Sequence, residues 1–222
     1  VRRLIQEGCK VRVLHRPGSD LKLLQSVPFE SFVGDVTDLQ SVMAACEGMK
    51  LVFHAASLVS YDGRQRSQMY ATNVEGTKNI LKACMAAKVK KLIYTSSVVA
   101  IGGSQSSRVL DENSPFELNP VNLGYYQTKK YAEGLVMERA QRGDINAVVV
   151  NPAVVFGPGD GLKGSRKIHM LVAAGRFPFY PPGALNVVGI DDVITGHWLA
   201  SQKGRSGERY ILSGENVSNK EL

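Results

Sequence analysis

The 222-residue chain is predicted to fold as an α/β protein with a doubly wound parallel sheet. Short apolar runs such as residues 51–56 and 145–150 alternate with longer segments of helical periodicity. Strands joined through helices pair in parallel, and the helices then cover both faces of the sheet. Polar and small residues follow several of these runs, where ligands bind in such a sheet. The sequence therefore predicts one site at the carboxyl ends of the strands.

The expected elements follow in chain order. Residues 1–8 have a helical pattern that stops at Gly8, and residues 17–20 form a turn into a short helix. The expected strands are residues 11–16, 29–33, 51–56, 91–97 and 145–150, and the expected longer helices are residues 39–46, 66–87 and 125–142.

Both ends of the sequence suggest an internal part of a longer protein. No start signal precedes the opening helical pattern. Ser218, followed three residues later by Glu221, has the spacing of a capping box at the start of a helix. We therefore expect further chain on either side.

The formal charge of +7 comes from scattered basic residues. The densest group is Lys88, Lys90 and Lys91, at a turn before an expected strand. This pattern favours a solvated face over a nucleic-acid interface, although a mild positive field also suits a phosphate-bearing ligand. No apolar run is long enough to span a membrane.

Three widely spaced cysteines, Cys9, Cys46 and Cys84, show no Cys-x-x-Cys spacing. They predict neither a disulfide framework nor a zinc site, and we expect no metal centre. They favour a reducing compartment, so a cytoplasmic protein is expected.

Residues 125–142 carry the strongest chemical signal. Tyr125 and Lys129 are four apart, so a helix places a phenol beside an ammonium. A nearby cation favours the phenolate, and the pKa of the phenol, about 10 when free, is then expected to fall toward the working range. Tyr126 and Lys130 form a rival pair with the same spacing.

Residues 125–133 resemble the active-site helix of the extended short-chain dehydrogenase/reductases, whose pattern is Tyr-x-x-Ser/Thr-Lys-x-x-Ala/Gly-Glu. The first pair, not the rival, fits this pattern. Further segments resemble motifs of the same family, within its dihydroflavonol-reductase-like branch: residues 34–38, 53–56, 73–77, 94–102, 151–160 and 188–193. The resemblance implies a Rossmann-type fold and covers nearly the whole chain.

The resemblance implies a catalytic triad of Ser97, Tyr125 and Lys129. Ser97 precedes Gly102 by five positions, as the family's catalytic hydroxyl does. Ser97 would hold the substrate oxygen and stabilise its developing charge. Tyr125 would exchange a proton with that oxygen, while Lys129 would keep Tyr125 acidic and anchor the nicotinamide ribose.

The cofactor implied is NAD(P), and Arg16 favours NADP. Arg16 ends the second strand of the usual fold, where a carboxylate binds the ribose 2′-hydroxyl and an arginine suits a 2′-phosphate. Asp35 is the expected partner of the adenine amino group, with Asp38 or Thr37 capping the next helix. The full set of expected cofactor contacts is Arg16, Asp35, Val36, His54, Ala55, Ala56, Thr95, Ser96, Tyr125, Lys129, Pro152, Val154 and Val155.

Three other polar positions carry expectations of a structural kind. His54 has no second histidine at ligand spacing, so we interpret it as a packed, hydrogen-bonded residue. Asn73 is expected to prop the site from within its helix. Asp191 and Asp192 are expected to cap a helix rather than to form a catalytic carboxylate pair.

The resemblance divides the chain into a dinucleotide-binding domain, residues 1–160, and part of a substrate lobe, residues 161–222, interleaved with the last strands. The family's first strand and Gly-x-x-Gly-x-x-Gly loop do not occur in the sequence and are expected upstream of Val1. Without that central strand, an unpaired apolar edge is expected. The aromatic segment 177–182 favours an apolar substrate over a sugar nucleotide.

Three functions stay open at this point. The first is an NADP-dependent reductase or dehydrogenase that transfers hydride to or from a small-molecule carbonyl or alcohol. The second is a nucleotide-sugar 4-epimerase with tightly bound NAD, and the third is a non-catalytic regulator that senses dinucleotide. A second copy is a possible partner, packed through residues 66–87 and 125–142 into a four-helix bundle.

Overall fold

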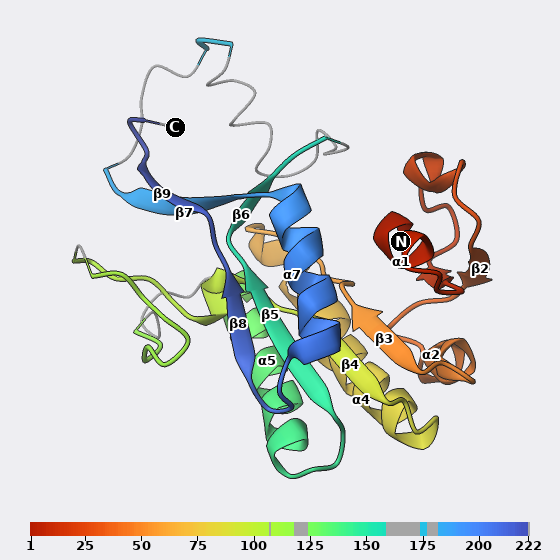
Figure 1. Cartoon of the computed structure of the whole chain (residues 1–222). Coiled ribbons are helices and arrows are strands. Elements are labelled where there is room, and N and C mark those ends of the chain that lie inside the picture. The colour runs from red at the N-terminus through yellow and green to blue at the C-terminus, as the bar shows by residue number, and fades with distance from the viewer. Residues whose placement is uncertain (107, 118–123, 159–173, 177–181, 222) are drawn as a thin grey trace.

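A computed structural model of the chain describes residues 1–106, 108–117, 124–158, 174–176 and 182–221. It confirms the predicted α/β class with parallel strands (Figure 1). The end of the 151–160 motif and most of the aromatic segment 177–182 lie outside these residues. Among the described helices, none is both long enough and apolar enough to cross a lipid bilayer.

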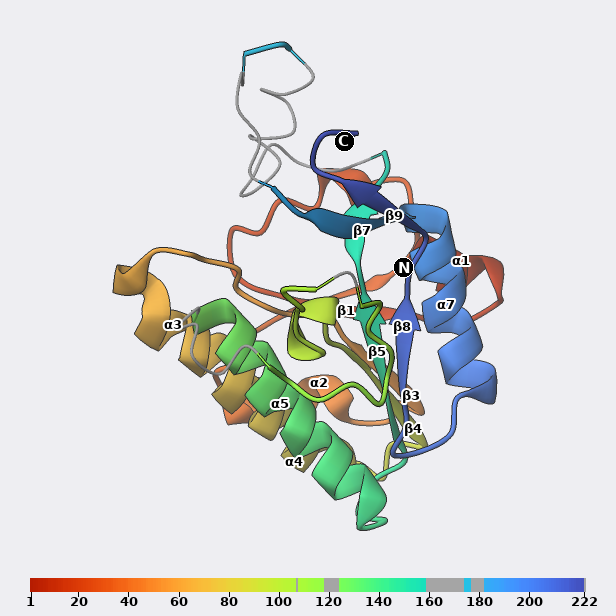
Figure 2. The same cartoon turned by 90° about the vertical axis from the view of Figure 1, so that its left-hand side faces the viewer.

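The main sheet contains four parallel strands in the order β3, β4, β5, β8. Their bounds are Leu51–His54 for β3, Lys91–Thr95 for β4, Ala147–Pro152 for β5 and Arg209–Leu212 for β8. The register pairs Leu51 with Lys91, Leu92 with Ala147, and Val149 with Arg209. Helices α4 (Gly76–Ala86) and α5 (Gly124–Gln141) cover one face, and α7 (Ile190–Lys203) covers the other (Figure 2). The sheet is therefore doubly wound, as predicted.

A second parallel sheet contains β1 (Arg12–His15) and β2 (Glu30–Val33). Helix α2 (Leu39–Cys46) follows it and packs against α4, so this unit is tied to the main sheet through helices. Within the described part of the chain, β1 pairs only with β2 and β3 pairs only with β4. This arrangement agrees with the unpaired central edge that the sequence predicts.

A third, small sheet contains β6 (Val154–Phe156), β7 (Ala184–Gly189) and β9 (Glu215–Ser218). β7 pairs in parallel with β6 and antiparallel with β9. The capping-box spacing is confirmed directly after β9. The amide and hydroxyl of Ser218 donate to Oε2 of Glu221 at 2.9 and 2.7 Å, and the amide of Glu221 donates back to the Ser218 hydroxyl at 3.2 Å.

The remaining helical elements are short or interrupted. Helix α1 (Arg2–Gln6) ends before Gly8, whose φ of +78° is the left-handed stop that the sequence predicts. The short helix after the 17–20 turn is a single 3₁₀ turn, Lys22–Leu24. The long helix predicted over residues 66–87 is α3 (Arg66–Tyr70), a π-helical segment Ala71–Glu75 and then α4.

Two strands are shorter than predicted at their carboxyl ends, and both corrections fall at the site. β3 stops at His54 instead of residue 56, and β4 stops at Thr95 instead of residue 97. After β4 the backbone turns, because the Ser97 hydroxyl accepts the Val99 amide at 3.4 Å and starts a 3₁₀ turn. Residues at the edge of a sheet can have strand-like composition without a ladder partner.

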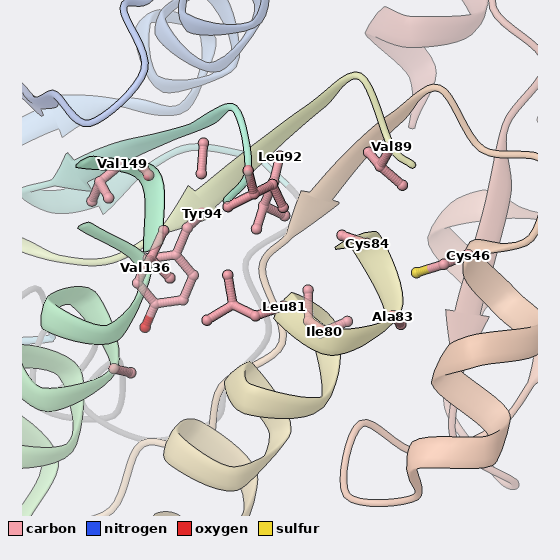
Figure 3. Packing of buried hydrophobic residues seen from close by; sticks show 14 of the residues in the cluster. Cys46, Ile80, Leu81, Ala83, Cys84, Val89, Leu92, Tyr94, Val136 and Val149 are labelled. Atoms are coloured by element: carbon pink, nitrogen blue, oxygen red, sulfur yellow. The ribbon is translucent and has the colours of Figure 1, made fainter. Parts of the chain in front are cut away.

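The largest apolar core lies between the main sheet, α4 and α5, and it extends to α2. β4 contributes Leu92 and Tyr94, and every residue of β5 is buried. Cys46 and Cys84 lie in this core as free thiols (Figure 3). The burial of β5 explains why its sequence is a continuous apolar run rather than an alternating one.

Candidate active site

Tyr125 lies in the first turn of α5, beside the turn that follows β4. Burial raises the pKa of Tyr125 to about 12, although a hydrogen bond with the Ser97 side chain acts to lower it. The structure thus brings Ser97 and Tyr125 together from segments 28 residues apart. At neutral pH the phenol keeps its proton, so it is available as a donor.

Lys129 lies one turn further along α5 and is only 2% exposed. Its Nζ donates to the carbonyl oxygen of Thr95 at 2.7 Å and lies 4.9 Å from the centre of the Tyr94 ring. Burial lowers the pKa of Lys129 to about 8, and the Glu133 carboxylate partly opposes this shift. The ammonium is therefore directed at the carboxyl end of β4.

The expectation that Lys129 lowers the pKa of Tyr125 is wrong for this structure. The ammonium is engaged by the Thr95 carbonyl, and burial dominates at the phenol. The rival pair is not assembled as a phenol–ammonium pair either. Lys130 Nζ lies 3.8 Å from the centre of the Phe116 ring, on the outer side of the helix.

Asn73 joins three parts of the site from the π-helical segment. Its Oδ1 accepts the Leu58 amide at 2.7 Å and the Ser57 hydroxyl at 3.1 Å. Its Nδ2 donates to the Leu58 carbonyl at 2.9 Å and to the Thr128 hydroxyl at 3.1 Å. The residue is 1% exposed, and it ties the loop after β3 to α5. The predicted propping role is confirmed.

His54, at the end of β3, is 3% exposed. Its Nε2 lies 3.0 Å from the Thr77 hydroxyl, and its ring packs against Tyr94 at a centroid distance of 5.4 Å. Burial, assisted by the nearby Lys129 charge, lowers the pKa of His54 to about 3. A neutral, hydrogen-bonded histidine fits the packed interpretation.

Two residues that sequence reasoning missed reach the same end of the sheet. His197 on α7 lies with Nε2 3.0 Å from the Thr95 hydroxyl, while its Nδ1 lies 2.8 Å from the Val193 carbonyl. Since Nδ1 faces an acceptor, Nε2 is the acceptor for Thr95. Arg209 on β8 forms a salt bridge at 2.9 Å with the buried Glu133. Both signals were present as polar residues within otherwise apolar segments.

The predicted adenosine-side residues lie on the two-stranded sheet. Arg16 is exposed at the end of β1. One carboxylate oxygen of Asp35 accepts the amide and hydroxyl of Thr37 at 2.9 and 2.8 Å. Asp38, rather than Thr37, caps α2 by accepting the Gln40 and Ser41 amides. Val36 packs against Gly76 of α4, where an added Cβ would lie 2.8 Å from its Cγ2.

The predicted nicotinamide-side residues lie at the ends of β3, β4 and β5. Ala55 and Ala56 are small and exposed, so the backbone after β3 is open to close approach. The Ser96 hydroxyl is buried with no hydrogen-bond partner in the described chain. After Pro152 the chain leaves the main sheet and enters β6, where Val154 and Val155 are half-buried. An accessible backbone, a spare hydroxyl and a buried ammonium fit one half of a dinucleotide.

Asp191 and Asp192 occupy the first turn of α7. No side-chain bond caps this helix, whose N-cap position is Gly189. The carboxylates stabilise the helix instead through its dipole, because negative charge is favourable at a helix N-terminus. The expected cap is therefore corrected to a first-turn charge interaction.

Serine, tyrosine and lysine side chains at the carboxyl ends of a doubly wound sheet define the class of extended short-chain dehydrogenase/reductases. The family model described as the 3-beta hydroxysteroid dehydrogenase/isomerase family matches residues 1–202. The chain therefore belongs to this family.

Two curated relatives exceed 30% identity over nearly the whole chain. "Putative dihydroflavonol 4-reductase" of Synechocystis is 36% identical over 98% of this chain and 64% of its own length. "Sterol demethylase protein B" of Methylococcus capsulatus is 34% identical over 98% of this chain and 66% of its own length. The chain spans just under two thirds of each relative.

The crystal structure of gox2253 superposes with a TM-score of 0.91 at 35% identity, over 98% of this chain and 66% of that one. The Thermus thermophilus UDP-glucose 4-epimerase, solved in complex with NAD, superposes with a TM-score of 0.83 over 99% of this chain and 75% of its own. At 22% identity the second match shows a shared fold only.

Proposed function

We propose that the chain forms the greater part of an NADP-dependent reductase or dehydrogenase acting on a small carbonyl or alcohol. The observation that carries the proposal is the contact between Ser97 and Tyr125 beside the buried Lys129 ammonium. When bound, the dinucleotide supplies or accepts the hydride. The relatives named as a dihydroflavonol reductase and a sterol demethylase protein support an apolar substrate class.

In this proposal the three side chains act on the substrate oxygen. Ser97 donates a hydrogen bond to the carbonyl and stabilises the charge that grows there. Tyr125, whose pKa of about 12 keeps it protonated, gives its proton to that oxygen, so the carbonyl becomes an alcohol. Lys129 places a positive charge at the end of β4, where the nicotinamide ribose is expected. Solvent then restores the proton to Tyr125.

Tyr125→Phe in the full-length protein tests this proposal, with Tyr126→Phe as the matched control. The first change removes the proton donor and should lower kcat by about 10²–10⁴-fold, the usual contribution of a general acid. NADPH affinity, measured by nicotinamide fluorescence, should stay within about twofold of wild type, because the phenol is one contact among many. Tyr126→Phe should keep turnover. Full activity in Tyr125→Phe would remove the assignment.

The same titration addresses the two alternatives. NAD that remains bound through purification, together with interconversion of sugar nucleotides, would support a 4-epimerase. Cofactor binding without turnover of any carbonyl, alcohol or sugar nucleotide would support a dinucleotide-sensing regulator. The assembled Ser97–Tyr125 contact favours an enzyme over the regulator, because a sensor has no use for a positioned proton donor.

We further infer that two copies associate through the outer faces of α3 and α5. Tyr70 on α3 is 44% exposed and Tyr131 on α5 is 53% exposed. Their ring centres are 6.4 Å apart, so they form one apolar patch on the side of the helices turned away from the sheet. Exposed aromatic pairs of this kind are typical of interfaces.

A further inference from the structure

A buried ion pair joins α5 to the far strand of the main sheet. Glu133, one turn after Lys129, is 3% exposed, and its Oε1 accepts Arg209 at 2.9 Å. Arg209 Nε also donates to the Glu112 carbonyl at 2.7 Å, and the Glu112 carboxylate accepts the Ile211 amide at 2.9 Å. Burying a carboxylate is costly unless it is paired and hydrogen-bonded, so this arrangement holds Glu133 ionised and in one orientation.

The other oxygen of Glu133 faces the site. Its Oε2 accepts Nδ2 of Asn151 at 2.7 Å, and the same Nδ2 donates to the Ser97 carbonyl at 3.0 Å. Asn151 is completely buried at the end of β5. The Ser97 carbonyl also accepts the Ala100 amide at 2.9 Å. Two donors thus fix the backbone of the residue whose hydroxyl meets Tyr125.

The charge of Glu133 decides which way the Asn151 amide points. An ionised carboxylate accepts hydrogen bonds and donates none, so it must face the NH₂ group of Asn151. Oδ1 of Asn151 is left buried, with no partner in the described chain. A flipped amide could give that oxygen a new environment, but it would turn Oδ1 toward Glu133 and toward the Ser97 carbonyl, which repel it. The unpartnered oxygen shows that the orientation is imposed by the two acceptors.

We propose that Glu133, held by Arg209, is a positioning residue for Ser97: its carboxylate orients the Asn151 amide, and that amide fixes the Ser97 backbone. This inference rests on the proposed function, because it assigns a task to the hydroxyl that holds the substrate oxygen. The pair acts through Asn151 and touches neither substrate nor cofactor. Its loss should affect kcat more than cofactor binding.

The test compares Glu133→Gln with Glu138→Gln in the full-length protein. Glutamine keeps the size of glutamate but can donate, so the flipped Asn151 amide becomes accessible and Oδ1 then faces the Ser97 carbonyl. The control lies on the same helix, where Glu138 pairs with Arg142 in an exposed contact. Turnover is measured with NADPH and phenanthrenequinone, an aromatic diketone, and cofactor binding is measured by nicotinamide fluorescence.

Glu133→Gln should lower kcat on the order of 10- to 100-fold, the cost of misplacing a reacting group by about 1 Å. The dissociation constant for NADPH should stay within about twofold, and Glu138→Gln should match wild type. Arg209→Met should resemble Glu133→Gln, and Arg209→Lys should recover part of the lost kcat because it keeps a positive charge beside Glu133. Unchanged kcat in Glu133→Gln, or equal losses of kcat and NADPH affinity, would overturn the proposal. If Glu133→Gln is insoluble, the ranking of Arg209→Lys above Arg209→Met in kcat, at equal NADPH affinity, decides instead.

Hydrogen exchange separates this proposal from the proposed function. In Glu133→Gln the amides of residues 99–101, which close the turn after Ser97, should exchange faster than in wild type and in Glu138→Gln. Faster exchange in a protein that reduces no carbonyl would keep the positioning role and remove the reductase assignment. Normal exchange with normal turnover would keep the reductase and remove the positioning role.

Discussion

Lys129 carries a charge in a place with almost no solvent contact. Its pKa falls from 10.5 to about 8, because burial penalises the ammonium. Below pH 8 the lysine is protonated in both the folded and the unfolded chain, and the folded state bears the full penalty. Between pH 8 and 10.5 only the unfolded chain holds the proton, so this residue's contribution to the free energy of unfolding rises with pH.

Comparison of wild type with Lys129→Met isolates this effect, because all other titrating groups are shared. The free energy of unfolding of wild type relative to the variant should rise by about 3 kcal/mol between pH 7 and pH 10.5, since each unit of pKa shift corresponds to 1.36 kcal/mol. Urea unfolding at several pH values measures it. Parallel stability curves for the two proteins would show that the ammonium is not buried.

Arg16 supplies the prediction for cofactor choice. Arg16→Glu exchanges a partner for a 2′-phosphate for one that binds a 2′-hydroxyl. The ratio of kcat/KM for NADPH to that for NADH should fall by about 10- to 100-fold, the value of a hydrogen bond to a charged group. Lys22→Glu, a matched change in the loop after β1, should leave the ratio unchanged. An unchanged ratio in Arg16→Glu would show that this end of β1 does not read the ribose.

At the residue scale, spacing predicted which side chains meet but not how they titrate. Tyr125 and Lys129 lie where a helical period puts them. The pKa of Tyr125 moves the other way from the expectation, because it depends on burial and on where the lysine nitrogen reaches. His197 and Arg209 come from distant elements, α7 and β8, so no local pattern links them to the site.

At the scale of elements, the interrupted helix from residue 66 to residue 86 is the part that local periodicity could not resolve. A π-helical segment differs from an α-helix by one hydrogen-bond step, and such segments often occur at functional sites. Here it presents Asn73 to the loop after β3 and to α5. Existence and type of the helix were predictable, because its apolar residues keep a helical period. The interruption was not, because it is stabilised by partners distant in sequence.

Asn73→Ala should destabilise the protein by about 2–4 kcal/mol, because the buried amide and carbonyl of Leu58 lose their partner together. Asn79→Ala on the same helix is the matched control. Asn79 makes one bond, to the Val36 carbonyl at 2.9 Å, and its loss should cost about 1 kcal/mol. Urea unfolding of the two variants gives the comparison. Equal, small effects would mean that water replaces the contacts of Asn73.

For the whole molecule, the strand–helix alternation predicted the sheet direction and the layers, because parallel strands need crossover helices. The division into three sheets was not predictable in the same way. β6 and β9 leave the main sheet through contacts with β7, more than 25 residues away from β6 in the sequence. Such pairings are fixed by tertiary packing, and short strands carry little local signal for them.

Association of two copies is the remaining prediction at this scale. The Tyr70 and Tyr131 rings lie together on the outer side of the helices that hold Asn73 and Tyr125, so a partner there would stiffen the elements that carry the site. Tyr131→Glu places a charge in the middle of this patch, and burying an unpaired charge is costly. In the full-length protein, the mass measured by light scattering should therefore halve. Val109→Glu changes an apolar side chain that is 76% exposed and lies away from these helices, and it should leave the mass unchanged. A wild-type protein of monomeric mass, or a Tyr131→Glu variant that stays dimeric, would place any interface elsewhere.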